Sequence, residues 1–177
     1  MLKRFGLVMR RAVCVVLFGG LAASLAAAAE APKPAGVITD AKSYQKLVAE
    51  QKGKVVLVSI WATWCPYCRQ EFADLVRLSK ELAGKPFALV SVTVDSKETW
   101  DSRVGPFLEK HGAKFPVYLA EPDKPGALLQ AIDPKWDGGI PAHFIYNDEG
   151  KRVISAVGAS SFEEMLARVK PLLPKTR

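Results

Sequence analysis

Apolar positions along the chain follow two different periods, which predict an alternation of helices and strands. Residues 42–51 place Tyr44, Leu47 and Val48 at helical spacing. Residues 54–60 are instead a β-branched apolar run after Gly53, which is typical of a strand covered on both faces. One further helix is predicted from the cysteines to Gly84. Three more are predicted over residues 99–111, 126–132 and 161–173. The other predicted strands occupy residues 87–94, 117–119, 142–146 and 152–157.

The order of these elements predicts the fold class. Strands and helices alternate through most of the chain, which ends with a hairpin across residues 147–151 and a final helix. Ser160 and Glu163 are expected to form a capping box at the start of that helix. The order predicts an α/β domain with a mixed central sheet and helices on both faces. A length of 177 residues fits one such domain.

The first 29 residues have the pattern of a secretory signal peptide. Four basic residues lie within the first eleven positions, an apolar run covers residues 12–29, and no acidic residue occurs before Glu30. Cleavage is expected after Ala29. The alternative is an uncleaved membrane anchor, because about 18 apolar residues just span a bilayer, although the alanine-rich composition favours cleavage. Residues 30–36 are expected to form a linker and residues 37–177 the folded domain.

The charge of the chain is explained largely by this leader. There are 25 Lys and Arg against 18 Asp and Glu, a net charge of +7. A clustered basic excess of this kind attracts nucleic acids or anionic membranes. The leader holds four of the 25 basic residues and none of the 18 acidic ones, so that residues 30–177 carry about +3. No run of five like charges occurs there, and nucleic acid is not expected as a partner.

Cys65 and Cys68 are the two cysteines outside the leader, which contains Cys14. They form a C-x-x-C pair between a predicted strand and the start of a predicted helix. Unpaired backbone N–H groups and the helix dipole favour a thiolate at Cys65. Pro66 suits the first helical turn, which needs no N–H from it. We therefore expect a redox pair in which Cys65 attacks and Cys68 resolves the mixed disulfide.

Two structural alternatives for the cysteine pair are weaker. Half of a zinc site would need about four ligands, and the histidines of the chain, His111 and His143, have no close ligand spacing to the cysteines. A purely structural disulfide closing so short a loop would remove little entropy from the unfolded chain. Redox chemistry is the favoured interpretation.

Two separated motifs resemble a known family. The segment W-A-T-W-C-P-Y-C at residues 61–68 is similar to the active-site segment of thioredoxin-fold proteins, in particular the exported TlpA/ResA-type thiol:disulfide oxidoreductases. The segment W-D-G-G-I-P at residues 136–141, with F-I at 144–145 and D-E-G at 148–150, resembles the region around that family's cis-proline. The resemblance covers about residues 37–173 and implies a thioredoxin fold.

The resemblance also implies roles for individual residues. Cys65 would be the nucleophile and Cys68 the resolving thiol. A cis-proline offers no N–H beside the sulfurs, while the backbone before it can pair with an extended substrate. The expected substrate-binding residues are Trp64, Pro66, Tyr67, Ile140 and Pro141, of which Pro141 is the cis-proline.

Glu71 is the third residue expected to take part in catalysis. It stands three residues after Cys68, where reductive members of the family have an acidic residue, and could accept the Cys68 proton. The alternative is an ordinary glutamate on the solvent face of the helix. Ser59 stands where thioredoxins have a buried aspartate, which strengthens Glu71 as the acceptor. Ala73 replaces a helix-kinking proline of many members, which leaves the shape of that helix open.

Other residues near the motifs are assigned mainly to structure. Trp61 is expected in the core, whereas Trp136 fits either plain packing or the lining of the substrate groove. His143 is expected to be a packed sheet histidine, and Asp95 a turn residue. Residues 96–132 correspond to the insertion typical of the family.

The predicted function is thiol:disulfide exchange without a cofactor or metal, in the periplasm or an equivalent oxidising compartment. The expected direction is reduction of protein disulfides, in the manner of cytochrome c maturation reductases, with re-reduction by a membrane electron donor. Contact with the membrane is expected only if the leader is retained. The alternatives are a disulfide oxidant or isomerase on the same fold, a non-catalytic thioredoxin-like binding module, and a copper or zinc carrier.

Overall fold

The computed structural model describes residues 33–174; the predicted leader, with Cys14, lies outside the described residues. The strands are β1 (Gly36–Ile38), β2 (Val55–Trp61), β3 (Phe87–Thr93), β4 (Val117–Ala120), β5 (Ala142–Tyr146) and β6 (Arg152–Val157). The α-helices are α1 (Ala41–Ala49), α2 (Pro66–Glu81), α3 (Gly105–His111), α4 (Pro125–Ile132) and α5 (Phe162–Val169). Three shorter helical segments are η1 (Lys97–Thr99), η2 (Trp100–Val104) and η3 (Lys170–Leu172).

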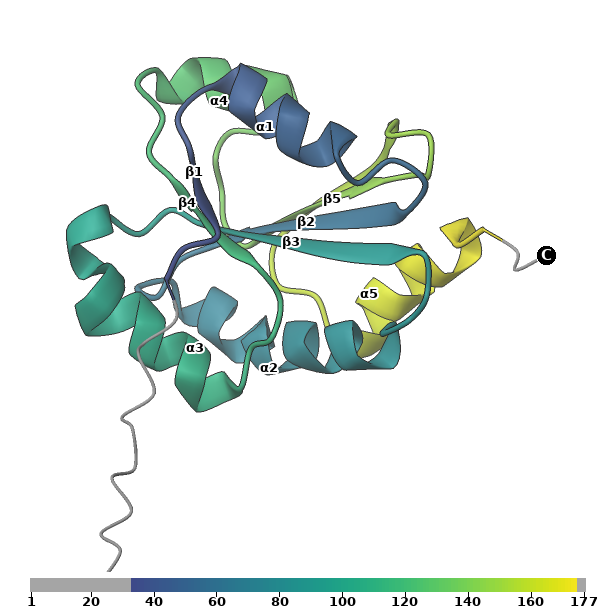
Figure 1. Ribbon diagram of the computed structural model, residues 1–177, viewed down its shortest axis with the longest axis horizontal. Coiled ribbons are helices and arrows are strands. Elements are labelled where there is room, and N and C mark those ends of the chain that lie inside the picture. Colours follow the sequence, from purple (N-terminus) through teal and green to yellow (C-terminus); the bar gives the residue numbers. More distant parts are fainter. Residues whose placement is uncertain (1–32, 175–177) are drawn as a thin grey trace, which may run out of the picture.

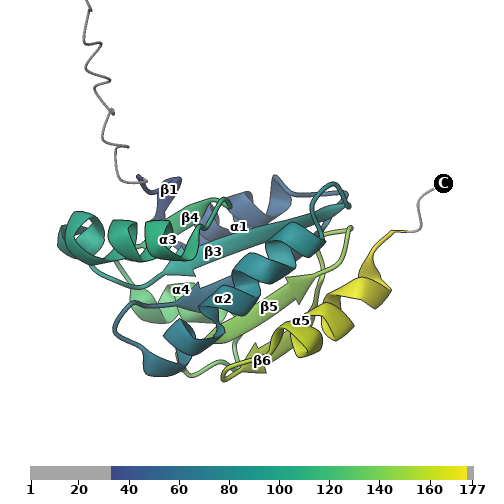
Figure 2. The same ribbon diagram turned by 90° about the horizontal axis from the view of Figure 1, so that it is seen from below.

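The strands form one mixed sheet in the order β1-β4-β3-β2-β5-β6. The first four strands of this order are mutually parallel, β5 is antiparallel to β2, and the edge strand β6 is antiparallel to β5. Helices α1 and α4 cover one face, and α2, α3 and α5 cover the other (Figure 1). Figure 2 shows the second face, with α2 crossing the sheet between α3 and α5. The predicted fold class is thus confirmed.

Strand β2 is central because its sequence can be buried on both sides. All seven of its residues are buried. Val55, Leu57 and Trp61 face the core under α2, α3 and α5. Val56, Val58 and Ile60 belong to the second core, under α1 and α4. Side chains alternate between the faces of a strand, and an apolar residue is needed at nearly every position.

Three details of the secondary structure differ from prediction. β1 is not among the predicted elements, because three residues are too few to show a period of two. The capping box of α5 is formed by Ser161 and Glu164, so the prediction of Ser160 and Glu163 is wrong by one residue. The helix predicted over residues 99–111 is α-helical only from Gly105 and begins with the π-helical turn η2.

Candidate active site

The cysteine pair lies where β2 ends and α2 begins. Cys65 is the N-cap of α2 and Pro66 is its first residue, as the sequence predicts. The Cys65 Sγ accepts a hydrogen bond from the backbone N–H of Cys68 at 3.2 Å, and the two cysteines are joined in a disulfide. Both sulfurs belong to largely buried residues, with Cys68 the more deeply buried of the two. The helix start therefore directs a backbone N–H group at the Cys65 sulfur.

The second motif faces this disulfide. The Ile140–Pro141 peptide bond is cis, and the Ile140 carbonyl oxygen lies 3.8 Å from the Cys65 Sγ. Trp136 fixes the loop before the proline, because its indole N–H donates to the Gly139 carbonyl oxygen at 2.8 Å. Trp136 also packs edge-on against Phe144, which confirms the expected packing role, and it lines an apolar pocket together with Trp64 and Ile140.

The surface around the disulfide is apolar and open. Trp64 and Tyr67 are 58% and 64% exposed, and Pro66 beside them is exposed as well. Trp64 and Ile140 line one side of an adjoining pocket of about 380 Å³, which extends under α4. Trp61 is fully buried, as expected, with its ring 4.6 Å from that of Phe72. The structure thus brings together the predicted substrate-binding residues.

Asp95 has a role that the sequence analysis did not assign to it. It lies in a bend after β3, but it is only 2% exposed. Its carboxylate accepts hydrogen bonds from the Thr63 backbone N–H at 2.8 Å, the Thr63 hydroxyl at 2.6 Å and the Thr93 hydroxyl at 2.5 Å. These bonds tie the end of β3 to the loop that carries Trp64 and Cys65. In the sequence, the feature that could have indicated this contact is Thr63, whose hydroxyl-bearing side chain lies two positions before Cys65.

Glu71 lies beneath the pair, on the buried side of α2. It is 3% exposed, which excludes the alternative of a solvent-facing glutamate. One carboxylate oxygen accepts the Ser160 backbone N–H at 2.8 Å and lies 3.2 Å from His143 Nε2. His143 is a buried residue of β5, as expected for a sheet histidine. Glu71 therefore lies one helical turn after Cys68 and on the same buried side of α2.

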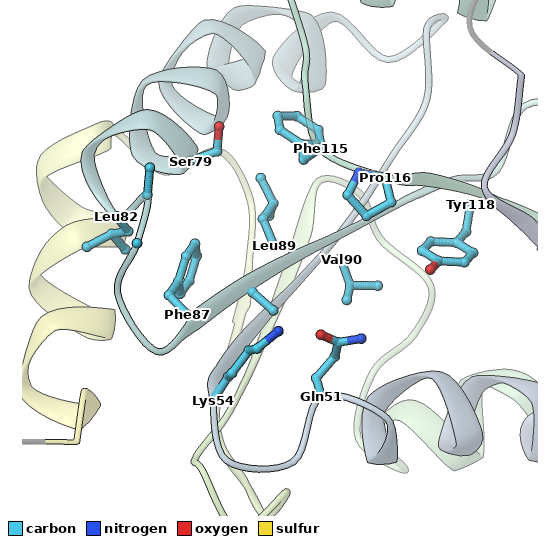
Figure 3. Close-up of a pocket in the computed structure, with 13 residues that line it drawn as sticks. Gln51, Lys54, Ser79, Leu82, Phe87, Leu89, Val90, Phe115, Pro116 and Tyr118 are labelled. Atoms are coloured by element: carbon cyan, nitrogen blue, oxygen red, sulfur yellow. The ribbon is translucent and has the colours of Figure 1, made fainter.

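A pocket elsewhere on the molecule is separate from this site. It has a volume of about 350 Å³ and lies at the opposite end of α2, against β3 and β4. Figure 3 shows the apolar side chains of Phe87, Leu89 and Phe115 around it, with Gln51 and Lys54 at its edge. Ser79, at this pocket, is eleven residues beyond Cys68 on α2, about 16 Å along the helix axis. It therefore has no part in the chemistry of the pair.

The fold and the site together define the protein as a thioredoxin-fold thiol:disulfide oxidoreductase. The model of the AhpC/TSA family matches residues 26–153, and the chain belongs to this family.

Named relatives support this class. The thiol-disulfide oxidoreductase ResA of Bacillus thuringiensis (strain Al Hakam) is 28% identical over 141 residues, which are 80% of this chain and 76% of that protein. The thiol:disulfide interchange protein DsbE of Allochromatium vinosum is 28% identical over 123 residues, or 70% of this chain and 62% of that protein. A solved thiol:disulfide interchange protein of the thioredoxin family from Chlorobium tepidum TLS superposes with a TM-score of 0.59 at 30% identity, covering 70% of this chain and 83% of that one.

Proposed function

We propose that this protein reduces disulfide bonds in protein substrates. The observation that carries the proposal is the buried Glu71 carboxylate, one helical turn after Cys68 on the same side of α2. A reductase must deprotonate Cys68 to complete each turnover, and a nearby base serves that step. The names of the relatives, ResA and DsbE, support a role in thiol:disulfide exchange.

In the proposed reaction, the Cys65 thiolate attacks one sulfur of the substrate disulfide. That bond breaks, a Cys65–substrate disulfide forms, and the other substrate sulfur leaves as a thiolate. Cys68 then loses its proton to a base and attacks the Cys65 Sγ, which forms the Cys65–Cys68 disulfide and releases the second substrate thiolate. The substrate gains two electrons, and the two cysteines of the protein lose them.

An extended segment of the substrate would lie across Trp64, Tyr67 and Ile140. The Ile140 backbone is placed beside the Cys65 Sγ and can pair with such a segment. The exposed rings of Trp64 and Tyr67 offer apolar contact area on either side of the sulfur. This arrangement suits an unfolded or flexible substrate region better than a compact one.

The proposed place of action is the periplasm or an equivalent oxidising compartment. The signal-peptide pattern of residues 1–29 supports export, and among the described residues no helix is long and apolar enough to cross a membrane. A reductase in this compartment needs a membrane electron donor. Expression of the full chain in a bacterial host, followed by mass analysis of the periplasmic protein, should give a chain that begins at Glu30. A retained leader would indicate a membrane-anchored form instead.

The direction of transfer is tested by the reduction potential of the Cys65/Cys68 couple. A reductase should equilibrate near thioredoxin, at about −270 mV, whereas a value near −120 mV, as for DsbA, would exclude a reductase. The measurement uses glutathione redox buffers and Trp64 fluorescence as the reporter, because this exposed ring adjoins Cys65 in sequence. A Trp64→Phe variant is the control for the assignment of the signal.

A cytochrome c maturation role predicts a particular substrate. The haem-attachment segment of such cytochromes is C-x-x-C-H, so a peptide with an oxidised C-x-x-C-H segment is the probe. Cys68→Ser should capture it as a stable mixed disulfide through Cys65, whereas the matched Cys65→Ser variant should capture none. Capture of model disulfide proteins but not of this peptide would favour a general reductase, and no capture by Cys68→Ser of either would favour a non-catalytic module.

A further inference from the structure

Three buried polar atoms beneath the disulfide have no hydrogen-bond partner. Within residues 33–174, the buried side-chain nitrogen and oxygen atoms without a partner are Ser59 Oγ, Glu71 Oε1 and His143 Nδ1. All three belong to one cluster, because Ser59 and His143 are register partners in β2 and β5, and His143 contacts Glu71. Buried polar groups are nearly always paired, so three unpaired ones in one cluster require a physical explanation.

The fold brings these residues to the face of the sheet that carries α2. Odd-numbered residues of β2 and β5, such as Leu57 and Ile145, pack in the core under α2 and α5. Ser59 and His143 share that parity and therefore that face. Cys68 and Glu71 are three residues apart on α2, which places them on one side of the helix, and both are buried there. The cluster thus lies on the same buried side of α2 as Cys68.

The two oxygens of Glu71 are not equivalent. Oε2 accepts the Ser160 N–H at 2.8 Å and forms a hydrogen bond with His143 Nε2 at 3.2 Å. Oε1 is also 3.2 Å from Nε2, but it has no partner in hydrogen-bond geometry. A carboxylate that is to accept a proton must be ionised, and an ionised carboxylate only accepts hydrogen bonds, so in this state the hydrogen of the contact belongs to His143 Nε2. Two donors therefore hold one oxygen, and the other retains a free lone pair.

Few other charged groups reach this cluster. The strands on either side of β5 place Ser59 and Ala156 beside His143, and neither residue ionises. From α2 the ionisable groups are Cys68 and Glu71 themselves. On α5, the Arg168 guanidinium donates a hydrogen bond to the Ser160 hydroxyl at 2.8 Å. It forms no ion pair with Glu71 itself, which accepts the Ser160 backbone N–H. The donor from β5 to the carboxylate is therefore His143 alone.

We infer that His143 is a positioning residue, which orients the Glu71 carboxylate so that its free oxygen accepts the proton of Cys68. The inference rests on the proposed thiol:disulfide function and adds a second residue, His143, to its proton-transfer step. His143 is 1% exposed and has no route to the substrate surface, so it acts through Glu71. His143 lies two positions after the cis-proline, so the backbone that would pair with substrate at Ile140 leads directly into the strand that carries it.

The step concerned is the second half of the reaction. The proton of the Cys68 thiol passes to Glu71 Oε1, and the resulting Cys68 thiolate attacks the Cys65 Sγ of the mixed disulfide. The Cys65–Cys68 bond forms, and the bond from Cys65 to the substrate breaks with release of the substrate thiolate. Glu71 later returns the proton to that thiolate or to solvent. His143 keeps its Nε2–H contact to Oε2 and neither gains nor loses electrons.

A two-phase thiol-release assay isolates this step. The reduced protein is mixed in a stopped-flow instrument with an aromatic disulfide whose released thiolate absorbs visible light. Attack by Cys65 releases the first equivalent, and resolution by Cys68 releases the second. The variants are His143→Leu, which removes the donor, His143→Gln, whose amide can still donate, and Glu71→Gln. His111→Gln, a histidine change away from the cluster, is the matched control.

His143→Leu should slow the second phase by at least about tenfold near neutral pH, since general-base assistance is worth about 10² or more. The first phase should remain within about twofold of the parent. The deficit should shrink as the pH rises, because hydroxide then removes the Cys68 proton without help from the carboxylate. His143→Gln should restore the second phase to within about threefold, and Glu71→Gln/His143→Leu should be no slower than Glu71→Gln alone, because His143 acts through the same carboxylate.

Other outcomes overturn the inference. Equal slowing of both phases by His143→Leu, at every pH, would mean that His143 only supports the fold. A normal second phase in folded His143→Leu, together with a slow one in Glu71→Gln, would mean that Glu71 needs no positioning. If His143→Leu fails to fold, the pH profile of His143→Gln against Glu71→Gln decides, since identical losses would contradict rescue by the amide. The aromatic disulfide reacts whatever the physiological direction, so failure of the proposed reductase role leaves this test intact.

Discussion

The contact between Thr63 and Asp95 gives the most direct prediction about stability. Replacing Thr63 by valine keeps the size and β-branching of the side chain but removes its hydroxyl. Asp95 Oδ1 then loses the hydrogen bond that it accepts at 2.6 Å, while the two bonds to Oδ2 remain. Both residues are buried, so solvent does not replace the lost partner.

The expected loss of stability follows from the chemistry of this bond. A hydrogen bond to a charged group contributes about 1.5–3 kcal/mol, and an unsatisfied buried acceptor places the loss in the upper part of this range. We therefore expect Thr63→Val to lower the free energy of unfolding by about 2–3 kcal/mol. For a domain of this size, each kcal/mol corresponds to about 2–4 °C, which gives a decrease in Tm of about 4–12 °C.

Equilibrium urea unfolding of the oxidised protein measures this change. The matched control is Thr99→Val, because the Thr99 hydroxyl donates at 2.7 Å to the neutral Ser96 carbonyl near the surface. That variant should lose no more than about 1 kcal/mol. A Thr63→Val midpoint equal to that of Thr99→Val, with unchanged m values, would refute the claim that the Asp95 carboxylate anchors the active-site loop.

Three further predictions concern the two cores and ionisable groups within them. Leu75→Ala, at a fully buried position of α2, should cost about 2–5 kcal/mol in urea unfolding; a loss below about 1 kcal/mol would contradict the packing described. Burial, and then the neighbouring Tyr146 hydroxyl at 2.7 Å, raise the pKa of Tyr44 well above its ordinary value. Above about pH 10 only the unfolded chain readily loses this proton, so stability should fall with rising pH, and less steeply in Tyr44→Phe. Burial, and then Lys110, lower the pKa of His111. The unfolded chain therefore binds this proton more readily, and stability should fall as pH drops below about 6.5 but less so in His111→Gln.

Much of the fold is predictable from local pattern, because burial on both faces leaves a clear mark on the sequence. The strand predicted over residues 54–60 corresponds to β2 within one residue, since an unbroken apolar run has few other structures open to it. The start of α2 is predicted by Pro66 and the cysteine spacing. The capping box of α5 is misplaced by one residue, because Ser160 and Ser161 both have an acidic residue three positions later. The sequence pattern does not show which of the two serines is the N-cap; the path of the folded chain at the start of the helix does.

The buried polar contacts of the site are harder to predict, because they join residues that are distant in sequence. Asp95 and Thr63 are 32 residues apart, and their contact depends on the adjacency of β2 and β3. Glu71 and His143 are 72 residues apart, and their contact depends on the register of β5 against β2. A shift of that register by one residue would turn His143 to the opposite face of the sheet. Periodicity indicates which face a residue occupies only after the pairing is known.

Ser59 and Glu71 differ from the arrangement that the resemblance to thioredoxins implies. By resemblance to thioredoxins, this position of β2 would carry an aspartate; here it is a serine whose hydroxyl has no partner among the described residues. The carboxylate comes from α2 instead, at Glu71, and reaches the same face of the sheet. A glutamate on a helix has a longer and more flexible side chain than an aspartate on a central strand, and without a partner it would adopt several rotamers. The Ser160 N–H and His143 hold it in one. The contacts from β5 and from Ser160 therefore restrict a carboxylate that its own helix leaves free to rotate.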